Sequence, residues 1–148
     1  MIRDVIVPLR NEAYQYSVSI RAELAADLPK VMADRVQLQQ VLTNLMLNGI
    51  EAMKDTNAAR ELTIKSQQAD NGQFLISVSD TGVGFAPQQA DQIFKAFFTT
   101  KPEGTGMGLP ISRSIIENHG GRLWATSNQP HGAIFQFTLP AEDERTSS

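Results

Sequence analysis

A short apolar strand that ends in a carboxylate places the strongest constraint on this fold. Its apolar side chains recur at every second position, at Phe74, Ile76 and Val78. This period predicts a strand with one buried face, and Asp80 continues it onto the same side. A buried aspartate needs a partner, and Gly82 and Gly84 leave space where a flat ligand could lie against the backbone. Alternatively, Asp80 caps a turn of the Asp-x-Gly type.

A second pattern predicts a helix from Asp34 to about Met53. Asp34 and Gln37 form a capping-box pattern at its start. On a helical wheel, an apolar stripe is centred on Leu38, Leu45, Gly49 and Ala52. Asn44 and Asn48 lie one turn apart at its border, where amides must be hydrogen-bonded. They either tie the helix to a loop or supply an oxygen to Mg²⁺, which takes few protein ligands beside phosphate oxygens.

A glycine-rich segment, residues 99–109, predicts a loop that leads into another helix. The segment ends in Gly104, Thr105, Gly106, Met107, Gly108 and Leu109. Glycines before a helix N-terminus present several backbone N–H groups to a phosphate. Lys101 adds a mobile positive charge. The pattern also suits any flexible loop. The apolar positions of the helix that follows are Leu109, Ile111, Ile115 and Ile116.

The remaining patterns predict helices and strands in mixed order. We expect a helix from Ile2 to Tyr16, strands over 18–24, 62–64, 74–78, 123–126 and 133–139, and a short helix from Pro87. In that helix Phe94 is expected in the core, although it could stack on a base. His119 is expected to cap the helix that ends at 118–121, and His131 to be solvated at a turn. This order favours helices on one face of a mixed sheet.

Composition narrows the class of protein. The 148 residues suit one domain and show no internal repeat. With 41% hydrophobic residues and a formal net charge of −3, the chain lacks the basic footprint of a nucleic-acid binder. It has no cysteine for disulfides or thiolate metal sites. No apolar run approaches the roughly 18 residues of a membrane span, and no signal-peptide pattern occurs, so we expect a soluble, cytoplasmic segment.

Other phosphate-binding motifs are missing from the sequence. No Gly-x4-Gly-Lys-Ser/Thr string occurs, which excludes a Walker A loop. The glycines follow a helix and a polar loop instead of a first strand, which disfavours a dinucleotide fold. The His-Arg-Asp and Asp-Phe-Gly signatures of protein kinases are also absent.

Four motifs in order give the chain a family resemblance. They are Asn44-x3-Asn48, Asp80-x-Gly82-x-Gly84, Phe94 to Phe98, and Gly104-x-Gly106-x-Gly108-Leu109. This combination resembles the catalytic, ATP-binding domain of bacterial two-component sensor histidine kinases, most of all the nitrogen-regulation and oxygen-sensing kind. The resemblance implies the Bergerat fold, an α+β two-layer sandwich with helices on one face of a mixed sheet. It assigns residues 1–140 to this domain and leaves 141–148 as a polar tail, expected to be disordered.

The resemblance also implies roles for single residues. Asn48 would hold Mg²⁺, and Asn44 would assist at the phosphates. Asp80 would accept a hydrogen bond from the adenine amino group, and Gly82 and Gly84 would let the base approach.

In the same way, the resemblance makes Thr99 to Leu109 the ATP lid. Lys101 is implied near the terminal phosphates. Thr99, Thr105 and Met107 would line the nucleotide together with the glycines.

By the same resemblance, the chain would bind ATP and Mg²⁺ and pass the γ-phosphate to a histidine. That histidine would lie on a dimerisation domain that this chain lacks, in the same or a partner kinase, with a response regulator receiver domain downstream. ATPases of the fold carry a glutamate where this chain has Asn44, and an amide cannot act as a general base. The alternatives are an ATPase or serine kinase of the same fold, or a non-catalytic nucleotide-binding module. No nucleic-acid or direct membrane contact is expected.

Overall fold

A computed structural model describes most of the chain. The described residues are 9–11, 13–24, 35–54, 59–68, 73–82, 84, 94, 108–128 and 131–140. Their elements are β1 (Ser19–Leu24), α2 (Arg35–Ala52), β2 (Glu61–Gln68), β3 (Gln73–Ser79), α3 (Gly108–Asn118), β4 (Arg122–Ser127) and β5 (Ala133–Pro140). Residues 9–11 and 13–15 are also helical. No helix in this part of the chain is long and apolar enough to cross a membrane.

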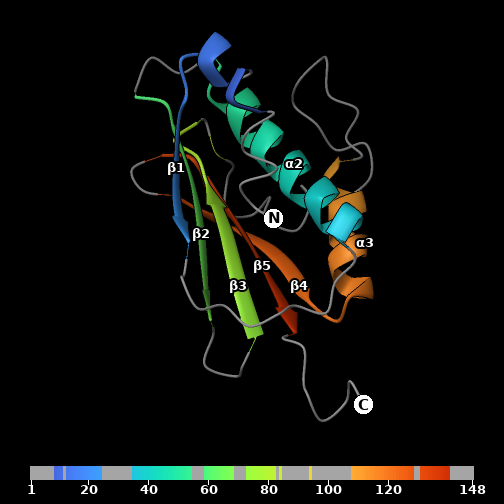
Figure 1. Cartoon of the computed structure of the whole chain (residues 1–148). Coiled ribbons are helices and arrows are strands. Elements are labelled where there is room, and N and C mark those ends of the chain that lie inside the picture. Colours follow the sequence, from blue (N-terminus) through green and yellow to red (C-terminus); the bar gives the residue numbers. More distant parts are fainter. Residues whose placement is uncertain are drawn as a thin grey trace.

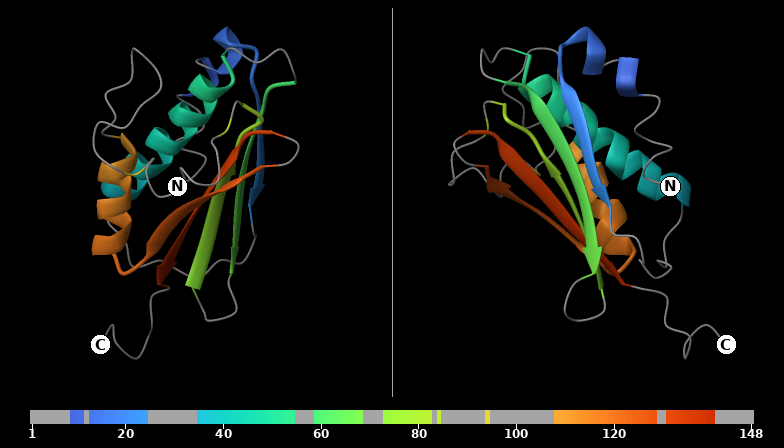
Figure 2. Two further views of the ribbon diagram at one scale, coloured as in Figure 1. Left: turned by 180° about the vertical axis from the view of Figure 1, so that it is seen from behind. Right: turned by 60° about the vertical axis from the view of Figure 1, so that its left-hand side comes forward.

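The five strands form one mixed sheet in the order β1-β2-β3-β5-β4. β1 pairs with β2 in parallel, and every other neighbouring pair is antiparallel. Helices α2 and α3 lie side by side on one face of the sheet (Figures 1 and 2), where α2 contacts β2 and β3 while α3 contacts β4 and β5. The expected α+β sandwich with helices on one face is confirmed.

The hydrophobic core lies between this helical layer and the sheet. β3 buries alternate residues, and Phe74, Ile76 and Val78 are at most 4% exposed. The buried face of α2 comprises Leu38, Val41, Leu42, Leu45, Met46, Gly49 and Ile50. This face is wider than the expected stripe because α2 contacts both the sheet and α3. Phe94 is buried as expected and packs edge-on against Phe135, with ring centroids 6.2 Å apart.

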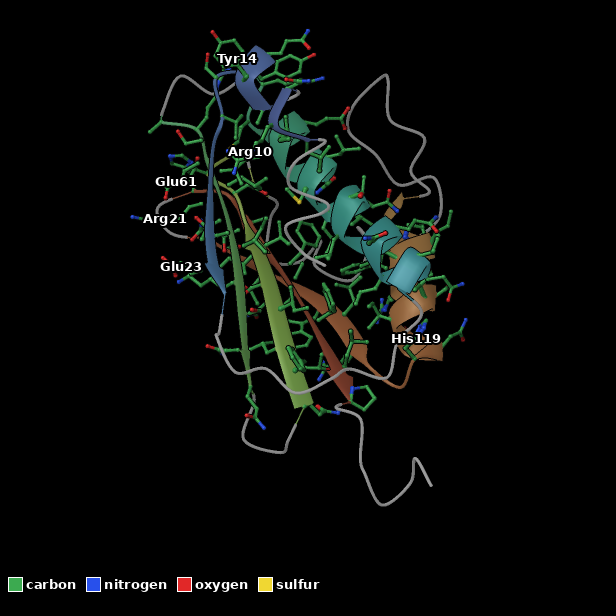
Figure 3. All side chains as sticks on the ribbon, in the orientation of Figure 1. Arg10, Tyr14, Arg21, Glu23, Glu61 and His119 are labelled. Atoms are coloured by element: carbon green, nitrogen blue, oxygen red, sulfur yellow. The ribbon has the colours of Figure 1, made fainter. Side chains whose placement is uncertain are left out.

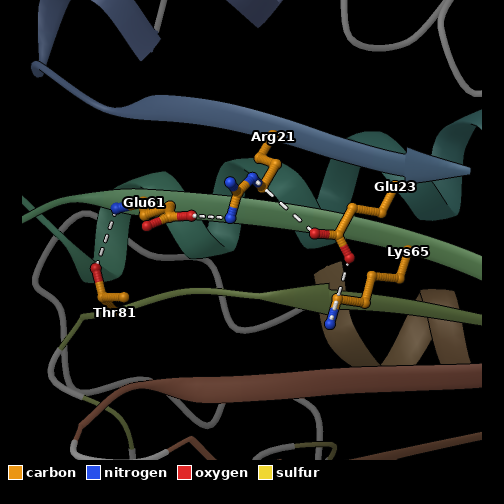
Figure 4. Close-up of polar contacts among 5 residues, drawn as sticks. All are labelled: Arg21, Glu23, Glu61, Lys65 and Thr81. Carbon is orange, nitrogen blue, oxygen red and sulfur yellow. Dashed lines mark hydrogen bonds and ion pairs between the residues drawn. The ribbon is translucent and has the colours of Figure 1, made fainter.

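The outer edge of the sheet at β1 carries alternating charges. Arg21 pairs with Glu61 at 3.6 Å and with Glu23 at 4.0 Å, and Glu23 also pairs with Lys65 at 3.5 Å (Figure 4). Arg21, Glu23 and Glu61 lie on the β1 side of the sheet, away from His119, which directly follows α3 (Figure 3). Each exposed pair contributes little free energy, but charges along an edge strand discourage pairing with another chain.

The helix α3 ends in a motif set by glycine. Gly120 has φ +80°, its N–H donates to Glu117 O, and the N–H of Gly121 donates to Ile116 O. These are the two hydrogen bonds of a Schellman cap. His119 Nδ1 lies 2.7 Å from Ile115 O, which confirms the expected capping histidine.

The start of α3 differs from the expected loop boundary. The helix begins at Gly108, so Gly108 and Leu109 belong to its first turn. Ile111 is 39% exposed, whereas Ser112 is fully buried. The reason is spacing, because Ser112 lies three and four residues before Ile115 and Ile116 and shares their stripe. The expected Asp34 cap, the expected helix over residues 2–8 and the polar tail lie outside the described residues.

Candidate functional site

Asp80 follows the last residue of β3 and is buried, with 1% of its surface exposed. Its Oδ1 accepts hydrogen bonds from Gly82 N at 2.9 Å and from Ala133 N at 3.2 Å. Its own backbone N–H donates to Ala133 O at 2.9 Å. The carboxylate therefore caps the Asp-x-Gly turn, as the structural alternative required, through the hydrogen bonds that its Oδ1 accepts.

The second oxygen of Asp80 faces the middle of α2. A Cβ built on Gly49 would lie 3.7 Å from Asp80 Oδ2 and 3.4 Å from Asp80 Cβ. Gly49 directly follows Asn48. A glycine inside a helix costs about 1 kcal/mol relative to alanine, and here it makes room for Leu62 of β2, whose Cδ1 would lie 2.7 Å from an added Cβ. The two motifs are therefore adjacent in space.

Gly82 packs against the C-terminal end of α2. A Cβ at this position would collide with the carbonyl group of Ala52. Gly84 lies against the backbone of Gly132. Helix and turn packing thus already require both glycines, and their approach to an adenine ring stays a prediction.

Two side chains of the segment between β4 and β5 hold the turn at Asp80. Asn128 Nδ2 donates to Asp80 O at 2.8 Å, and His131 Nδ1 lies 3.2 Å from Gly82 O. His131 is half-buried, so the expectation of a solvated histidine is wrong. The cause is that this segment folds back onto the turn, where Gly132 also packs against Asp80 O.

Thr81 anchors the same turn from the other side. Its hydroxyl donates to Ala59 O at 2.7 Å and accepts from Glu61 N at 3.1 Å (Figure 4). The hydroxyl also lies 3.4 Å from Met53 Sδ. The turn is therefore fixed to the start of β2 as well as to the end of β4.

Asn44 and Asn48 are both half-buried on α2, as expected for the border of its apolar face. Asn44 Nδ2 donates to Ser112 Oγ in α3 at 3.3 Å. Glu51 is half-buried and its carboxylate lies 4.0 Å from Lys54 Nζ. Helix α2, which carries the amide pair, thus lies between Asp80 and α3.

Several predicted site residues lie outside the described residues. They are Thr99, Lys101, Gly104, Thr105, Gly106 and Met107. Leu109 is half-buried against the core. The described part brings Asp80, Gly82 and Gly84 together with the end of α2, and it joins Asn44 to α3.

The side chains of this site suit a metal ion that binds together with a nucleotide, because phosphate oxygens and waters would then supply most of its ligands. Among the described residues, no group of three or more His, Cys, Asp and Glu side chains could hold a metal ion. Asn44 and Asn48 offer neutral amide oxygens. Mg²⁺ is usually held by one or two protein oxygens together with phosphate oxygens and waters, and these amides fit that pattern.

Sequence reasoning missed Ser112, Thr81 and Asn128. The burial of Ser112 could have been predicted from the sequence, because Ser112 falls on the same helical stripe as two buried isoleucines. The close packing at Gly49 could have been predicted too, since glycine inside a helix is costly unless something approaches it closely. No local sequence pattern predicted the hydrogen bond of Asn128, because its partner Asp80 lies 48 residues away in the sequence.

Known proteins resemble the chain in sequence and in structure. Sensor protein FixL of Bradyrhizobium diazoefficiens is 50% identical over 132 residues, which are 89% of this chain and 26% of FixL. Full-length ShkA in complex with AMPPNP superimposes with a TM-score of 0.84 at 29% identity, over 95% of this chain and 29% of ShkA. The nucleotide-free catalytic domain of the histidine kinase ThkA gives 0.83 at 35% identity, over 95% of this chain and 90% of that domain. ThkA has also been solved in complex with the response regulator protein TrrA.

The chain spans about a quarter of the length of FixL. A family model described as "Histidine kinase-, DNA gyrase B-, and HSP90-like ATPase" matches residues 33–143, a range that holds the amide pair, Asp80 and the glycine cluster. This chain therefore belongs to the family of histidine kinase-, DNA gyrase B- and HSP90-like ATPases.

Proposed function

We propose that this chain binds Mg²⁺-ATP and donates the γ-phosphate to a histidine on a separate dimerisation domain, as the catalytic segment of a two-component sensor kinase. One observation carries the proposal. The segment of α2 from Asn44 to Gly49 meets Asp80 through Gly49 and meets α3 through Asn44. Asp80 and α3, which are far apart in the sequence, thus both meet the helix that carries the amide pair.

Each residue in this arrangement has a proposed role. Asp80 accepts a hydrogen bond from the adenine amino group, and its turn with Gly82 and Gly84 lies beside the base. Asn48 holds Mg²⁺ and Asn44 assists at the phosphates. When bound, Mg²⁺ neutralises charge on the phosphate oxygens.

On sequence grounds we assign the phosphates to Lys101 and the glycine cluster that precedes α3. Backbone N–H groups at a helix N-terminus favour negative charge. Thr99, Thr105, Met107 and Leu109 complete the proposed nucleotide contacts.

The proposed acceptor is a protein histidine and not water. Asn44 occupies the position where the resemblance places a base in the ATPases, and an amide cannot take a proton from water. His119 caps α3 and His131 holds a turn, so each has a structural task. We propose residues 1–140 as the catalytic domain. A response regulator receiver domain is the proposed downstream partner, supported by the ThkA–TrrA complex.

The test is phosphotransfer to a supplied acceptor. The chain is incubated with γ-labelled ATP, Mg²⁺ and the histidine-bearing dimerisation domain of FixL, its 50% identical relative. We expect label on the acceptor that is lost in acid, as phosphohistidine is, and much less label with the Asp80→Asn variant at an ATP concentration below its Kd.

Other results would support the competing functions. Acid-stable label would indicate a serine kinase of the same fold. Rapid phosphate release without an acceptor would indicate an ATPase. ATP binding without any transfer would contradict the kinase proposal and favour a binding module.

A further inference from the structure

Ser112 is a polar residue in the contact between α2 and α3. Its side chain is 0% exposed, and the neighbouring stripe residues Ile115 and Ile116 are also buried. Alanine would be a better helix former at this position and would need no hydrogen-bond partner. A buried hydroxyl costs free energy unless it is bonded, and the partner of this one is Asn44 Nδ2 at 3.3 Å.

We propose that Ser112 is a positioning residue, which orients the Asn44 amide toward the metal side of the bound nucleotide. This inference rests on the proposed function. An amide can present either an oxygen or an NH₂ group. Because Nδ2 of Asn44 donates to Ser112, its Oδ1 is the end that remains for a ligand. An acceptor oxygen attracts a cation or its waters and repels a phosphate oxygen.

The same bond ties α2 to the start of α3. Ser112 lies one turn after Gly108, the first residue of α3 and the last glycine of the cluster. The distance between the amide pair and the N-terminus of α3 is therefore held by a direct polar contact. Without that contact, Asn44 can turn its NH₂ group toward the nucleotide.

The test compares nucleotide affinity with and without the metal. Calorimetry gives the dissociation constants of ATP with Mg²⁺ and of ATP with EDTA for the chain and for Ser112→Ala, Asn44→Ala and the double variant. The matched control is Ser114→Ala, because Ser114 is an exposed serine on the same helix. Ser112→Cys fills the same space with a weaker acceptor, and thermal melts confirm that each variant is folded.

We expect Ser112→Ala to weaken Mg²⁺-ATP binding about three- to tenfold, the range for one lost hydrogen bond. Binding of metal-free ATP should change less than about twofold by the same reasoning, since that bond acts through the metal side. In the Asn44→Ala background, Ser112→Ala should have no further effect. Ser112→Cys should shift affinity in the same direction as Ser112→Ala, and Ser114→Ala should behave as the unmodified chain.

Three results would overturn the inference. The first is an equal loss of ATP affinity in Ser112→Ala with and without Mg²⁺. The second is a loss of affinity on Ser112→Ala that persists in the Asn44→Ala background. The third is unchanged affinity in both Ser112 variants. Failure of the proposed function is distinguishable, because the unmodified chain would then either bind no Mg²⁺-ATP or bind it without transferring phosphate to the supplied histidine domain, and neither result depends on Ser112.

Discussion

Asp80 combines a structural task with a proposed chemical one. Its Oδ1 accepts two backbone hydrogen bonds, while its Oδ2 faces Gly49. Oδ1 thus fixes the turn, and acceptance of the adenine amino group is the proposed chemical task of Asp80.

Asp80→Asn separates these two tasks. The amide oxygen can still accept from Gly82 N and Ala133 N, so the turn survives. The second position becomes a donor, and a donor cannot accept the adenine amino group. We expect nucleotide affinity to fall roughly 10- to 100-fold, equivalent to about 1.5–3 kcal/mol for a charged hydrogen bond. Calorimetry measures the affinity and a thermal melt measures the fold; unchanged affinity would remove Asp80 from the adenine site.

Asn48→Ala tests the proposed magnesium ligand. Without the amide oxygen, ATP should bind about equally well with Mg²⁺ and with EDTA, because the metal then gains no protein ligand at this position. The matched control is Gln40→Ala, since Gln40 is an exposed amide on the same helix. If Asn48→Ala kept the full difference in ATP affinity between Mg²⁺ and EDTA, Asn48 would not be a magnesium ligand.

Single residues were predictable where a local period reached them. The alternation of β3 predicted that Asp80 would be buried, and the wheel of α2 placed Asn44 and Asn48 at the border of the apolar face. The hydrogen bonds from Asn128 and His131 were not predictable, because they join residues 48 and 49 positions apart. Such contacts depend on how β5 pairs with β3, and no local pattern specifies that pairing.

Two helical segments end in the same way with different residues. Val18 N donates to Ala13 O at 2.8 Å and Ser17 N donates to Tyr14 O at 3.1 Å, with Ser17 at φ +58°. At the end of α3 the equivalent position is Gly120 at φ +80°. A side chain in this left-handed region costs free energy that glycine avoids. The first helical segment therefore ends in a less favourable cap than α3.

Exchanging the two caps should shift stability in opposite directions. Ser17→Gly should raise the free energy of unfolding by about 0.5–1 kcal/mol, and Gly120→Ala should lower it by about 1 kcal/mol. In a domain of this size each change corresponds to roughly 2–4 °C in Tm. Denaturant titration and thermal melts measure both. A stabilising Gly120→Ala would contradict the cap, because among the described residues only Pro140 lies within reach of the added methyl group, at 3.6 Å.

The elements themselves followed closely from sequence. Capping, apolar period and turn residues predicted α2 and the five strands β1 to β5, all of which the structure contains. The start of α3 was less predictable, because glycine is a poor helix former and the glycine cluster indicated a loop up to Leu109. In the structure, Leu109 packs against the core within the first turn of α3.

At the scale of the whole molecule, the sheet serves as a platform. β2, β3 and β5 are its inner strands, and Asp80 at the end of β3 is hydrogen-bonded to Ala133, the first residue of β5. Helix α2 lies on one face of this sheet, where it contacts β2, β3 and α3 (Figure 1). The amide pair and the aspartate are therefore fixed by regular elements, which limits their relative motion.

This arrangement provides binding and positioning without a general base at Asn44. We expect the chain alone to release phosphate from ATP slowly, well below the 1–100 s⁻¹ typical of kinases. Phosphate release by the chain with ATP and Mg²⁺ measures this directly. Turnover on that scale, lost in Asn44→Ala, would indicate an ATPase instead.

The most direct test of the central claim is a thermal melt of the chain with ATP and Mg²⁺, with ATP and EDTA, and without ligand. Ligand at about 100 times its Kd adds roughly 2.7 kcal/mol to the free energy of unfolding. For a domain of this size that corresponds to a rise in Tm of several degrees. The account predicts this rise with ATP and Mg²⁺ and a smaller one with EDTA. No rise at millimolar Mg²⁺-ATP would contradict a nucleotide site between α2 and the turn at Asp80.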